Sequence, residues 1–542
     1  LWMGYVEQPN DGDGTLVLSE LDGSGRHEAQ NGTGLKFSKD GRWAAFLTSP
    51  PEDEAEALGK DRSPVPRTFH LVDLRTGDQS EEIGVRSFAF SSDGRFLAIH
   101  RDRSDSEAEH EGSDLLLRDL NEETLLSLGN VTEYAFNEMG THLAYLVDAA
   151  GSTGNGLYLV SAEIGRIRPL ETASASFEDL VWNEDGDALA ALSGTTPEGK
   201  TQKENVLLVT TDIADTPSVT TYDPTSDPTF PEGFVLSELA STRWIGDGTQ
   251  VLVGIKKQQE EALEESDEES PNVDVWHWAD ERLQSRQMVQ ADADRRFTYA
   301  SVYNVDTGTF VRLADEDMPR VDDTDNGRWG VGRLDAPYRG DVTQDGGRAD
   351  YVRIDLTTGD RQTVAEGIRR GMGTSPDSRW LLYVKDAAVH ATDLETLEST
   401  NLTTSTGIDF INREFDQMTE HPAYGVGGWT EDDEVLLYTR YDVYAVPLAG
   451  GDAVAVTGGA GARDEIRYRI VRLDPEADWV DAEGAVLSAY GEWTKKSGYA
   501  SARPGNDPEQ RIFGDEMISG LRKATDADRV VFTRQTFEQF PD

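Results

Sequence analysis

Apolar and polar residues follow one pattern that recurs eight times along the chain. The full pattern has an aromatic residue four positions before a turn residue, and apolar residues three and five positions after it. The clearest copies are Phe37 to Phe46 (FSKDGRWAAF) and Phe90 to Ile99 (FSSDGRFLAI). The leading position is aromatic in six of the eight copies, against 8% of all residues, so composition alone does not produce the pattern. The turn residues are Gly41, Gly94, Gly140, Gly186, Gly248, Gly327, Ser378 and Asp433.

Each copy predicts a β-hairpin. Residues two positions apart point to the same face of a strand, so pairs such as Ala44 and Phe46 give every copy an apolar face. Asp-Gly supplies the tight turn, because Gly accepts a positive φ at little cost. Two further strands usually follow each hairpin. The third strands are expected at Phe69 to Leu74, Leu115 to Leu120, Leu157 to Val160, Val206 to Val209, Tyr351 to Leu356 and Val443 to Leu448.

Four antiparallel strands in a unit of about 45 to 60 residues describe a β-propeller blade. The sequence therefore predicts an all-β chain, a β-propeller of four-stranded antiparallel blades over residues 1–542. Eight blades fit best, and seven or nine are compatible with the repeat. Both ends resemble incomplete blades, which predicts truncation at each end, and residues 466–542 are expected to be trailing strands.

Charge narrows the classes of partner. The 542 residues include 102 acidic and 50 basic ones, a formal charge of −52, which disfavours nucleic acids and anionic membrane surfaces. Only 11 of the basic residues are Lys, and the acids are spread over the whole chain, which indicates a salt-adapted surface. An ordinary acidic protein is the alternative. There is no Cys and no apolar stretch near the roughly 20 residues of a membrane helix, so a soluble chain is expected.

The longest insertion in the repeat is the acidic segment 256–272, predicted to be a flexible loop within the propeller. Val273 to Arg282 (VDVWHWADER) then places two Trp around a His, which fits an anchoring strand better than a ligand-stacking site. Asp322 to Gly327 (DDTDNG) resembles a calcium loop only weakly, because Arg333 stands where an acidic ligand is required.

The chemistry of a catalytic site is missing from the sequence. Only Gly373 is followed two positions later by Ser, and Ser375 lies in a blade turn, so there is no Gly-x-Ser-x-Gly nucleophile elbow. The eight His residues are scattered, without the spacing of metal ligands, and no phosphate-binding loop is present. The sequence therefore predicts no catalytic residue, no metal site and no cofactor, and the chain alone is expected to be inactive.

Several longer stretches are similar to the N-terminal propeller of serine peptidases of the prolyl oligopeptidase (S9) family, in a bacterial branch. The likeness spans nearly the whole chain. The stretches that carry it are Val275 to Trp278 with Asp280 and Arg282 to Gln284, Ala423 to Gly425 with Gly428 to Thr430, Arg440 to Tyr444, Val471 to Asp474, Leu487 to Tyr499 (LSAYGEWTKKSGY) and Phe532 to Asp542 (FTRQTFEQFPD).

The resemblance implies that an α/β-hydrolase domain with a Ser-Asp-His triad follows in cis and hydrolyses short peptides, while the propeller gates access and docks them. The likeness ends where that domain would begin, so no triad residue is assigned here. Such a parent would be periplasmic or secreted, whereas the acidic composition also suits a salt-rich cytoplasm. Location, cleavage specificity and oligomeric state stay open.

One stretch is a candidate for contact with a peptide amino terminus. Ile411 to Tyr424 (INREFDQMTEHPAY) is long and acidic and lies between blades, with Glu414 and Glu420 as the contact residues. A connecting loop without a ligand is the alternative for this stretch. For the whole chain, two other classes stay open. One is a free-standing TolB-like propeller that binds proteins or peptides, and the other is a glycan- or lactone-acting propeller with metal ligands in its channel.

Overall fold

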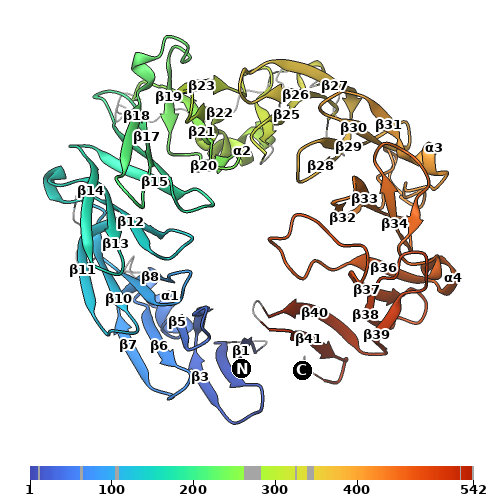
Figure 1. Cartoon of the computed structure of the whole chain (residues 1–542), viewed down its shortest axis with the longest axis horizontal. Helices are drawn as coiled ribbons and strands as arrows, with labels where there is room; N and C mark the ends of the chain where they lie inside the picture. Colours follow the sequence, from blue (N-terminus) through green and yellow to red (C-terminus); the bar gives the residue numbers. More distant parts are fainter. Residues whose placement is uncertain are drawn as a thin grey trace. The chain divides into compact units, whose positions relative to one another are not determined.

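The computed structural model describes residues 1–9, 12–60, 65–103, 109–261, 277, 282, 284–323, 326–338, 347–524 and 527–539 (Figure 1). The chain divides into two compact units, which are described separately. Unit 1 is Leu1–Asn272 with Ala291–Phe310, and unit 2 is Val273–Gln290 with Val311–Asp542. The boundary falls within α2 (Gln284–Arg296) and within β23 (Thr309–Arg312).

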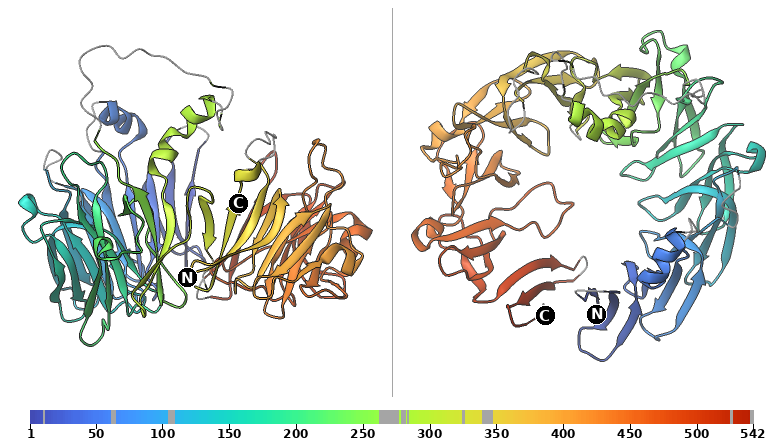
Figure 2. Two further views of the ribbon diagram at one scale, coloured as in Figure 1. Left: turned by 90° about the horizontal axis from the view of Figure 1, so that it is seen from above. Right: turned by 180° about the vertical axis from the view of Figure 1, so that it is seen from behind.

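Unit 1 is a series of antiparallel sheets in which consecutive strands pair. The first two sheets are β1-β2-β3 (Trp2–Glu7, Thr15–Glu20, Arg26–Gln30) and β4-β5-β6-β7 (Gly32–Phe37, Trp43–Thr48, Thr68–Asp73, Gln79–Ile83). Helix α1 (Glu52–Lys60) joins β5 to β6 and extends past the ends of their strands (Figure 2).

Two larger sheets of unit 1 each combine two sets of four strands. The first consists of β8 (Val85–Phe90), β9 (Phe96–Arg101), β10 (Ser113–Asp119), β11 (Leu125–Phe136), β12 (His142–Val147), β13 (Gly156–Ser161) and β14 (Arg166–Thr172). Strand β11 is the last strand of one set and the first strand of the next. In the second, β19 links the sets: β15 (Ser176–Trp182), β16 (Leu189–Thr195), β17 (Glu204–Thr211), β18 (Ser218–Tyr222), β19 (Phe234–Ser237), β20 (Arg243–Ile245), β21 (Gln250–Lys257), β22 (Tyr299–Asn304) and β23. Two 3-10 turns also belong to this unit, η1 (Ala150–Ser152) and η2 (Pro224–Ser226).

Unit 2 contains four separate four-stranded sheets and a final hairpin. The sheets are β24-β25-β26-β27 (Arg320–Asp323, Trp329–Leu334, Ala349–Asp355, Arg361–Ile368), β28-β29-β30-β31 (Arg370–Thr374, Trp380–Lys385, Ala388–Asp393, Ser399–Asn401), β32-β33-β34-β35 (Val426–Thr430, Glu434–Tyr438, Val443–Pro447, Val454–Ala455) and β36-β37-β38-β39 (Ile466–Ile470, Val486–Gly491, Ser497–Ser501, Glu509–Gly514). The hairpin is β40 (Met517–Lys523) with β41 (Val530–Gln535). Short helices are η3 (Ala336–Tyr338), α3 (Leu402–Thr406) and α4 (Ala460–Asp464).

The predicted all-β class and the four-stranded antiparallel blade sheets of a β-propeller are confirmed. All eight repeat turns connect the first and second strands of a four-stranded set. In addition, β36 to β39 form a four-stranded sheet without the repeat, because residues 471–485 replace its tight first turn. The described residues thus contain nine four-stranded sets, β11 being counted in two, which lies within the predicted range of seven to nine. Residues 256 and 257 end strand β21, and residues 262–272 of the predicted insertion lie outside the described residues.

The repeat is defined by backbone conformation as much as by sequence. The turn residue has a positive φ in all eight copies, from 56° at Asp433 to 76° at Gly94. Six copies use Gly there, whereas Ser378 (58°) and Asp433 hold the same left-handed conformation with a side chain. The left-handed region costs a residue with a Cβ atom about 1 kcal/mol. These two positions therefore store local strain.

We expect Ser378→Gly to stabilise unit 2 by about 0.5 kcal/mol, because relief of the left-handed strain outweighs the added freedom of the unfolded chain. Urea unfolding followed by circular dichroism measures the difference. Ser378→Ala is the matched control, since it removes the hydroxyl and keeps the Cβ atom. A gain in the alanine variant equal to that in the glycine variant would contradict the backbone explanation.

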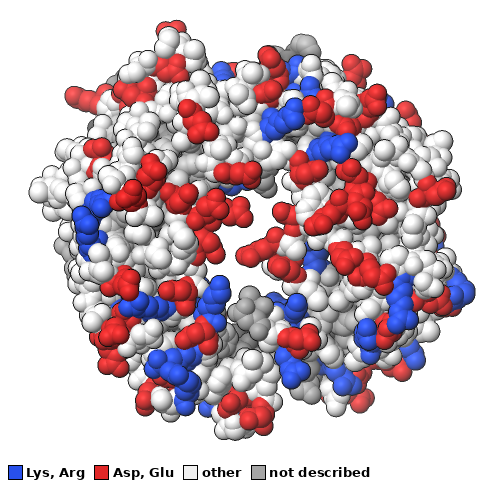
Figure 3. All heavy atoms as spheres, in the orientation of Figure 1, with Lys and Arg blue, Asp and Glu red and all other residues white. Residues whose placement is uncertain are grey.

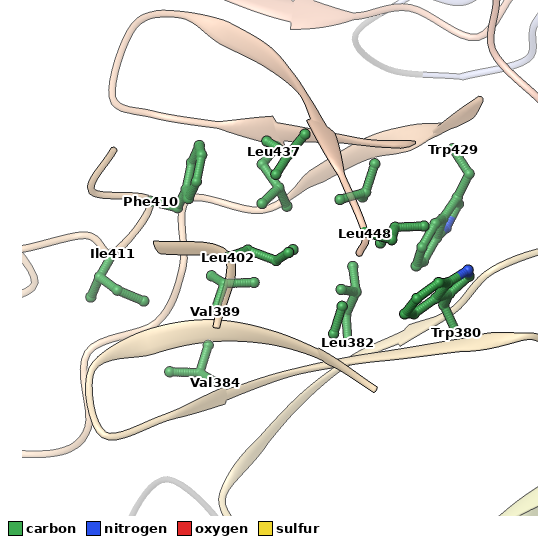
Figure 4. Close-up of a cluster of buried hydrophobic side chains, with 13 residues drawn as sticks. Trp380, Leu382, Val384, Val389, Leu402, Phe410, Ile411, Trp429, Leu437 and Leu448 are labelled. Carbon is green, nitrogen blue, oxygen red and sulfur yellow. The ribbon is translucent and has the colours of Figure 1, made fainter. Parts of the chain in front are cut away.

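Apolar residues fill the spaces between neighbouring sheets. In unit 2, Leu382 and Val389 of one sheet pack with Val435, Leu437 and Leu448 of the next (Figure 4). In unit 1, indoles link successive four-stranded sets: Trp182 Nε1 donates to the Ala135 carbonyl at 3.0 Å and Trp244 Nε1 to the Val181 carbonyl at 3.2 Å. A single sheet could not bury both of its faces, so stacking provides the core.

A buried aspartate at the end of the third strand fixes several sheets. Asp73 Oδ2 accepts from Arg42 Nε at 3.0 Å and Nη2 at 2.9 Å, and its Oδ1 accepts from the Arg75 backbone N–H at 2.9 Å. Arg95 with Asp119 repeats the ion pair. Burial alone would raise the pKa of Asp73, but the hydrogen bonds from Arg75 and Arg42 hold it below its usual value.

Asp73→Asn should cost unit 1 about 2 kcal/mol at pH 7, because a charge-assisted hydrogen bond to Arg42 is lost. The lowered pKa means that the contribution is complete above the unfolded-state pKa and disappears as the pH falls through the folded-state pKa. The difference between the variant and the original chain should therefore shrink from pH 7 to pH 3 in urea titrations. Asp78→Asn, at an exposed position of the same turn, is the control. A difference that does not change with pH would contradict the assignment.

Candidate functional site

Unit 2 has a cavity of about 610 Å³ at one end of its strands, the size range of ligand pockets. Arg348 precedes β26, Glu366 lies near the end of β27, Arg369 connects β27 to β28, and Lys385 is the last residue of β29. We call this cavity the charged pocket. Its described lining consists of Arg348, Glu366, Gly367, Arg369, Val384, Lys385, Asp386, Gln417, Met418, Thr419 and Glu420.

Hydrogen bonds hold the connections that build the charged pocket. Asp350 Oδ1 accepts from the Tyr338 hydroxyl at 2.6 Å and from the Gly367 backbone N–H at 2.8 Å, so one carboxylate joins η3 to β27. Arg370 Nε donates to the Glu420 carbonyl at 3.0 Å, and its guanidinium lies 5.6 Å from the centre of the Phe415 ring. These contacts fix the walls before any ligand binds, which limits the entropic cost of binding.

The segment with Glu420 is a loop closed at its base. Ile411 pairs with Ala423, and the Asn412 N–H donates to the Pro422 carbonyl at 2.8 Å. Phe410 and Ile411 are fully buried in the apolar cluster that also holds Trp380 and Trp429 (Figure 4). The apolar residues at the base therefore anchor the loop, while residues 417–420 reach the charged pocket.

The structure separates the two predicted contact residues. Glu420 lines the charged pocket and is half-buried. Burial raises the pKa of the Glu420 carboxyl, and the positive charges of Arg369, Arg370 and Arg348 oppose this increase. Glu414 is exposed and does not line the pocket; its carboxylate pairs with Arg440, which also contacts Glu492 at 2.6 Å. Only Glu420 is therefore placed to meet a ligand in this cavity.

Sequence reasoning missed the basic residues of the charged pocket. Its described lining includes three basic residues (Arg348, Arg369 and Lys385) and three acidic residues (Glu366, Asp386 and Glu420). The three basic residues come from separate connections, so no sequence motif links them. The pair Arg369-Arg370 is no signal by itself, because the sequence contains four other pairs of adjacent basic residues.

Besides the contact of Thr141 with the adjacent His142, two hydroxyl–imidazole contacts occur among the described residues of unit 1, outside the charged pocket. Ser113 Oγ lies 2.9 Å from His100 Nε2, but the same nitrogen contacts the Val131 carbonyl at 2.9 Å and must carry the proton to donate there. It therefore cannot take a proton from Ser113, whose hydroxyl donates to the Arg101 carbonyl. Burial also lowers the pKa of His100, which favours the neutral ring. This pair is a structural contact between strands.

The second contact links three adjacent strands. Thr48 Oγ1 lies 2.9 Å from His70 Nε2, and His70 Nδ1 lies 3.3 Å from Glu81 Oε1. The Phe46 ring stacks on the His70 ring with centroids 4.8 Å apart. Burial lowers the pKa of His70 despite the negative charge of Glu81. The contacts run across β5, β6 and β7, as expected of cross-strand side-chain pairs.

Among the residues that the structure describes, no three His, Asp or Glu side chains converge closely enough to hold a metal ion. Residues 324 and 325 of the calcium-like stretch lie outside that set, as do residues 273–276, 278–281 and 283 around the Trp-His-Trp sequence. None of the described helices has the length and apolar character needed to cross a lipid bilayer.

Comparison with known proteins gives structural likeness alone. No protein-family model and no curated protein matches the sequence. Among solved structures, a eukaryotic initiation factor is 10% identical, with a TM-score of 0.36 over 72% of this chain and 83% of that chain. The β-propeller domain of the Trilobed protease from Pyrococcus furiosus is 14% identical, with a TM-score of 0.28 over 67% and 96%. A prolyl endopeptidase is 12% identical, with a TM-score of 0.31 over 72% and 52%.

Proposed function

We propose that this chain is the propeller portion of a serine peptidase of the prolyl oligopeptidase family. In this role it docks short peptides and gates their access to an α/β-hydrolase domain that follows in cis. The stretches Arg440 to Tyr444 and Leu487 to Tyr499 support the family, and the charged pocket supports the docking role. The peptide bond itself would be cut in the hydrolase domain through an acyl-enzyme.

The observation that carries this proposal is the position of Glu420. Its half-buried carboxylate opens into a cavity large enough for a short peptide, and a peptide amino terminus is an ammonium group with three N–H donors. A hydrogen bond between opposite charges in a partly buried site is stronger than one between neutral groups. Glu420 would therefore orient the peptide by its amino end.

Calorimetric titration of the chain with trialanine tests the role of Glu420. Glu420→Gln should weaken binding about tenfold, because it removes the charge and leaves the size of the side chain unchanged. Glu414→Gln is the matched control, since Glu414 lies on the same loop and faces Arg440 instead of the pocket. Equal affinities of the original chain and the Glu420 variant would contradict the proposal.

The peptidase assignment has a separate test. The coding sequence beyond Asp542 should contain a Gly-x-Ser-x-Gly motif followed by Asp and His codons. In that full-length parent, Glu420→Gln should reduce kcat/KM for short peptides, and Glu414→Gln should leave it unchanged. A stop codon directly after Asp542 in an intact genome would contradict the peptidase assignment.

A further inference from the structure

We infer that the charged pocket also binds a carboxylate group, so that its ligand is a short peptide with both ends free. The inference rests on the proposed peptide-docking function and concerns the opposite end of the same ligand. Lys385 is the main group that we infer to bind the carboxylate. Arg348, Arg369 and the Thr419 hydroxyl are further polar groups of the same pocket.

Lys385 is a cation without a partner in the described structure. Its side chain lines the charged pocket at the β29–β30 turn, and its ammonium group makes no hydrogen bond or ion pair with any residue that the structure describes. Acidic residues outnumber basic ones 102 to 50, and other lysines of the chain do form ion pairs, such as Lys203 with Glu178. An ammonium group kept available in a ligand-sized cavity is suited to bind an anionic group.

Thr419 supplies a second uncommitted group. Its Oγ1 is buried and has no hydrogen-bond partner within the described part of the chain. Leaving a buried hydroxyl without a partner is costly, and a bound water or ligand group is one way in which such a hydroxyl is satisfied. A hydroxyl can donate to a carboxylate oxygen. Lys385 and Thr419 reach the pocket from separate segments, the β29–β30 turn and the loop that carries Glu420.

The charges of the pocket lining limit what kind of anion can enter. Molar KCl screens the formal charge of −52 over a few Å, so the nearest charges are those of the described lining, which carries equal numbers of acidic and basic groups. A zwitterion has no net charge to be repelled and can satisfy both signs of the lining. A peptide with a free amino end near Glu420 and a free carboxyl end near Lys385 fits this pattern, whereas a simple anion does not.

Calorimetric titrations at one KCl concentration at which the chain is folded test the inference. The ligands are trialanine, its C-terminal amide and its N-acetyl derivative. The original chain should bind the amide about tenfold more weakly than trialanine. Lys385→Met should weaken trialanine binding about tenfold and abolish the preference for trialanine over the amide. Lys385→Arg should keep that preference, and Lys523→Met, an exposed control on β40, should bind like the original chain.

The outcomes separate the two proposals. If trialanine and its amide bind equally well while the N-acetyl derivative binds weakly, the carboxylate inference is wrong and the role of Glu420 stands. If acetylation has no effect and amidation weakens binding, Lys385 keeps its role and Glu420 loses its own. If none of the three peptides binds, both are overturned. The melting curve of the Lys385→Met variant is the folding control. If it matches that of the original chain, the variant is folded and any lost affinity comes from the missing ammonium group.

Discussion

Replacing Asp442 by alanine should lower the free energy of unfolding of unit 2 by about 4 kcal/mol. The carboxylate is almost fully buried and accepts three hydrogen bonds: from the Thr457 hydroxyl at 2.7 Å and from the backbone N–H groups of Gly461 and Ala462, each at 2.8 Å. Alanine would leave these donors without an acceptor in a buried site. Gly461 is required for the contact, because a Cβ atom there would lie 2.6 Å from Asp442 Oδ1.

Urea unfolding of the purified chain, followed by tryptophan fluorescence, measures the effect. Asp432→Ala is the matched control, because Asp432 is exposed in the turn between β32 and β33 and should change stability by less than about 0.5 kcal/mol. Asp442→Asn should lose an amount of stability between those of the two alanine variants, since its single amide oxygen can accept only some of the three hydrogen bonds. A loss below about 1 kcal/mol in Asp442→Ala would refute the structural role of this carboxylate.

Transfer from molar KCl to a dilute buffer should destabilise the whole chain strongly. Asp and Glu side chains are spread over the visible face of the molecule, with fewer Lys and Arg among them (Figure 3). The screening length of charges is about 30 Å at about 0.01 M salt and about 3 Å at 1 M salt. Carboxylates whose mutual repulsion is screened at high salt therefore repel each other at low salt. We expect the melting temperature to be lower by about 10 °C or more in dilute buffer.

Calorimetric scans across a series of KCl concentrations measure the salt effect. A parallel series in sucrose separates charge screening from the general stabilising effect of an excluded solute. The prediction requires a rise in melting temperature with KCl that continues beyond the concentration that screens ordinary surface ion pairs. A melting temperature that is higher in dilute buffer than in molar KCl would identify the chain as an ordinary acidic protein.

The fold was accessible from sequence because its determinants are local. A turn residue and the apolar pair after it lie within six positions, so one short pattern specifies each hairpin. Ser378 illustrates the strength of the pattern: the surrounding residues predict a hairpin there, and the backbone takes a left-handed φ even without Gly. The sheet β36 to β39 carries no such turn, so it could be anticipated only as loose trailing strands.

The candidate site could be predicted only in part from the sequence, because its residues come together through tertiary structure. The acidic character of residues 411–424 was enough to single out Glu420, but the same reasoning selected Glu414, which the fold turns toward Arg440. Lys385 carries no local signal of function. The role proposed for it depends on a cavity formed by four chain segments, and no spacing within a single sequence records that arrangement.

The indole contacts between successive four-stranded sets of unit 1 bear on how such a chain can evolve. Trp182 and Trp244 each donate to a main-chain carbonyl of the preceding set, an acceptor that every amino acid supplies. A newly duplicated copy would contain its own indole N–H donor, and the main chain of the neighbouring copy would supply the carbonyl acceptor. No compensating substitution in the neighbour would be needed. Gene duplication can therefore lengthen the array by whole copies, and afterwards the exposed connections at the strand ends are free to diverge.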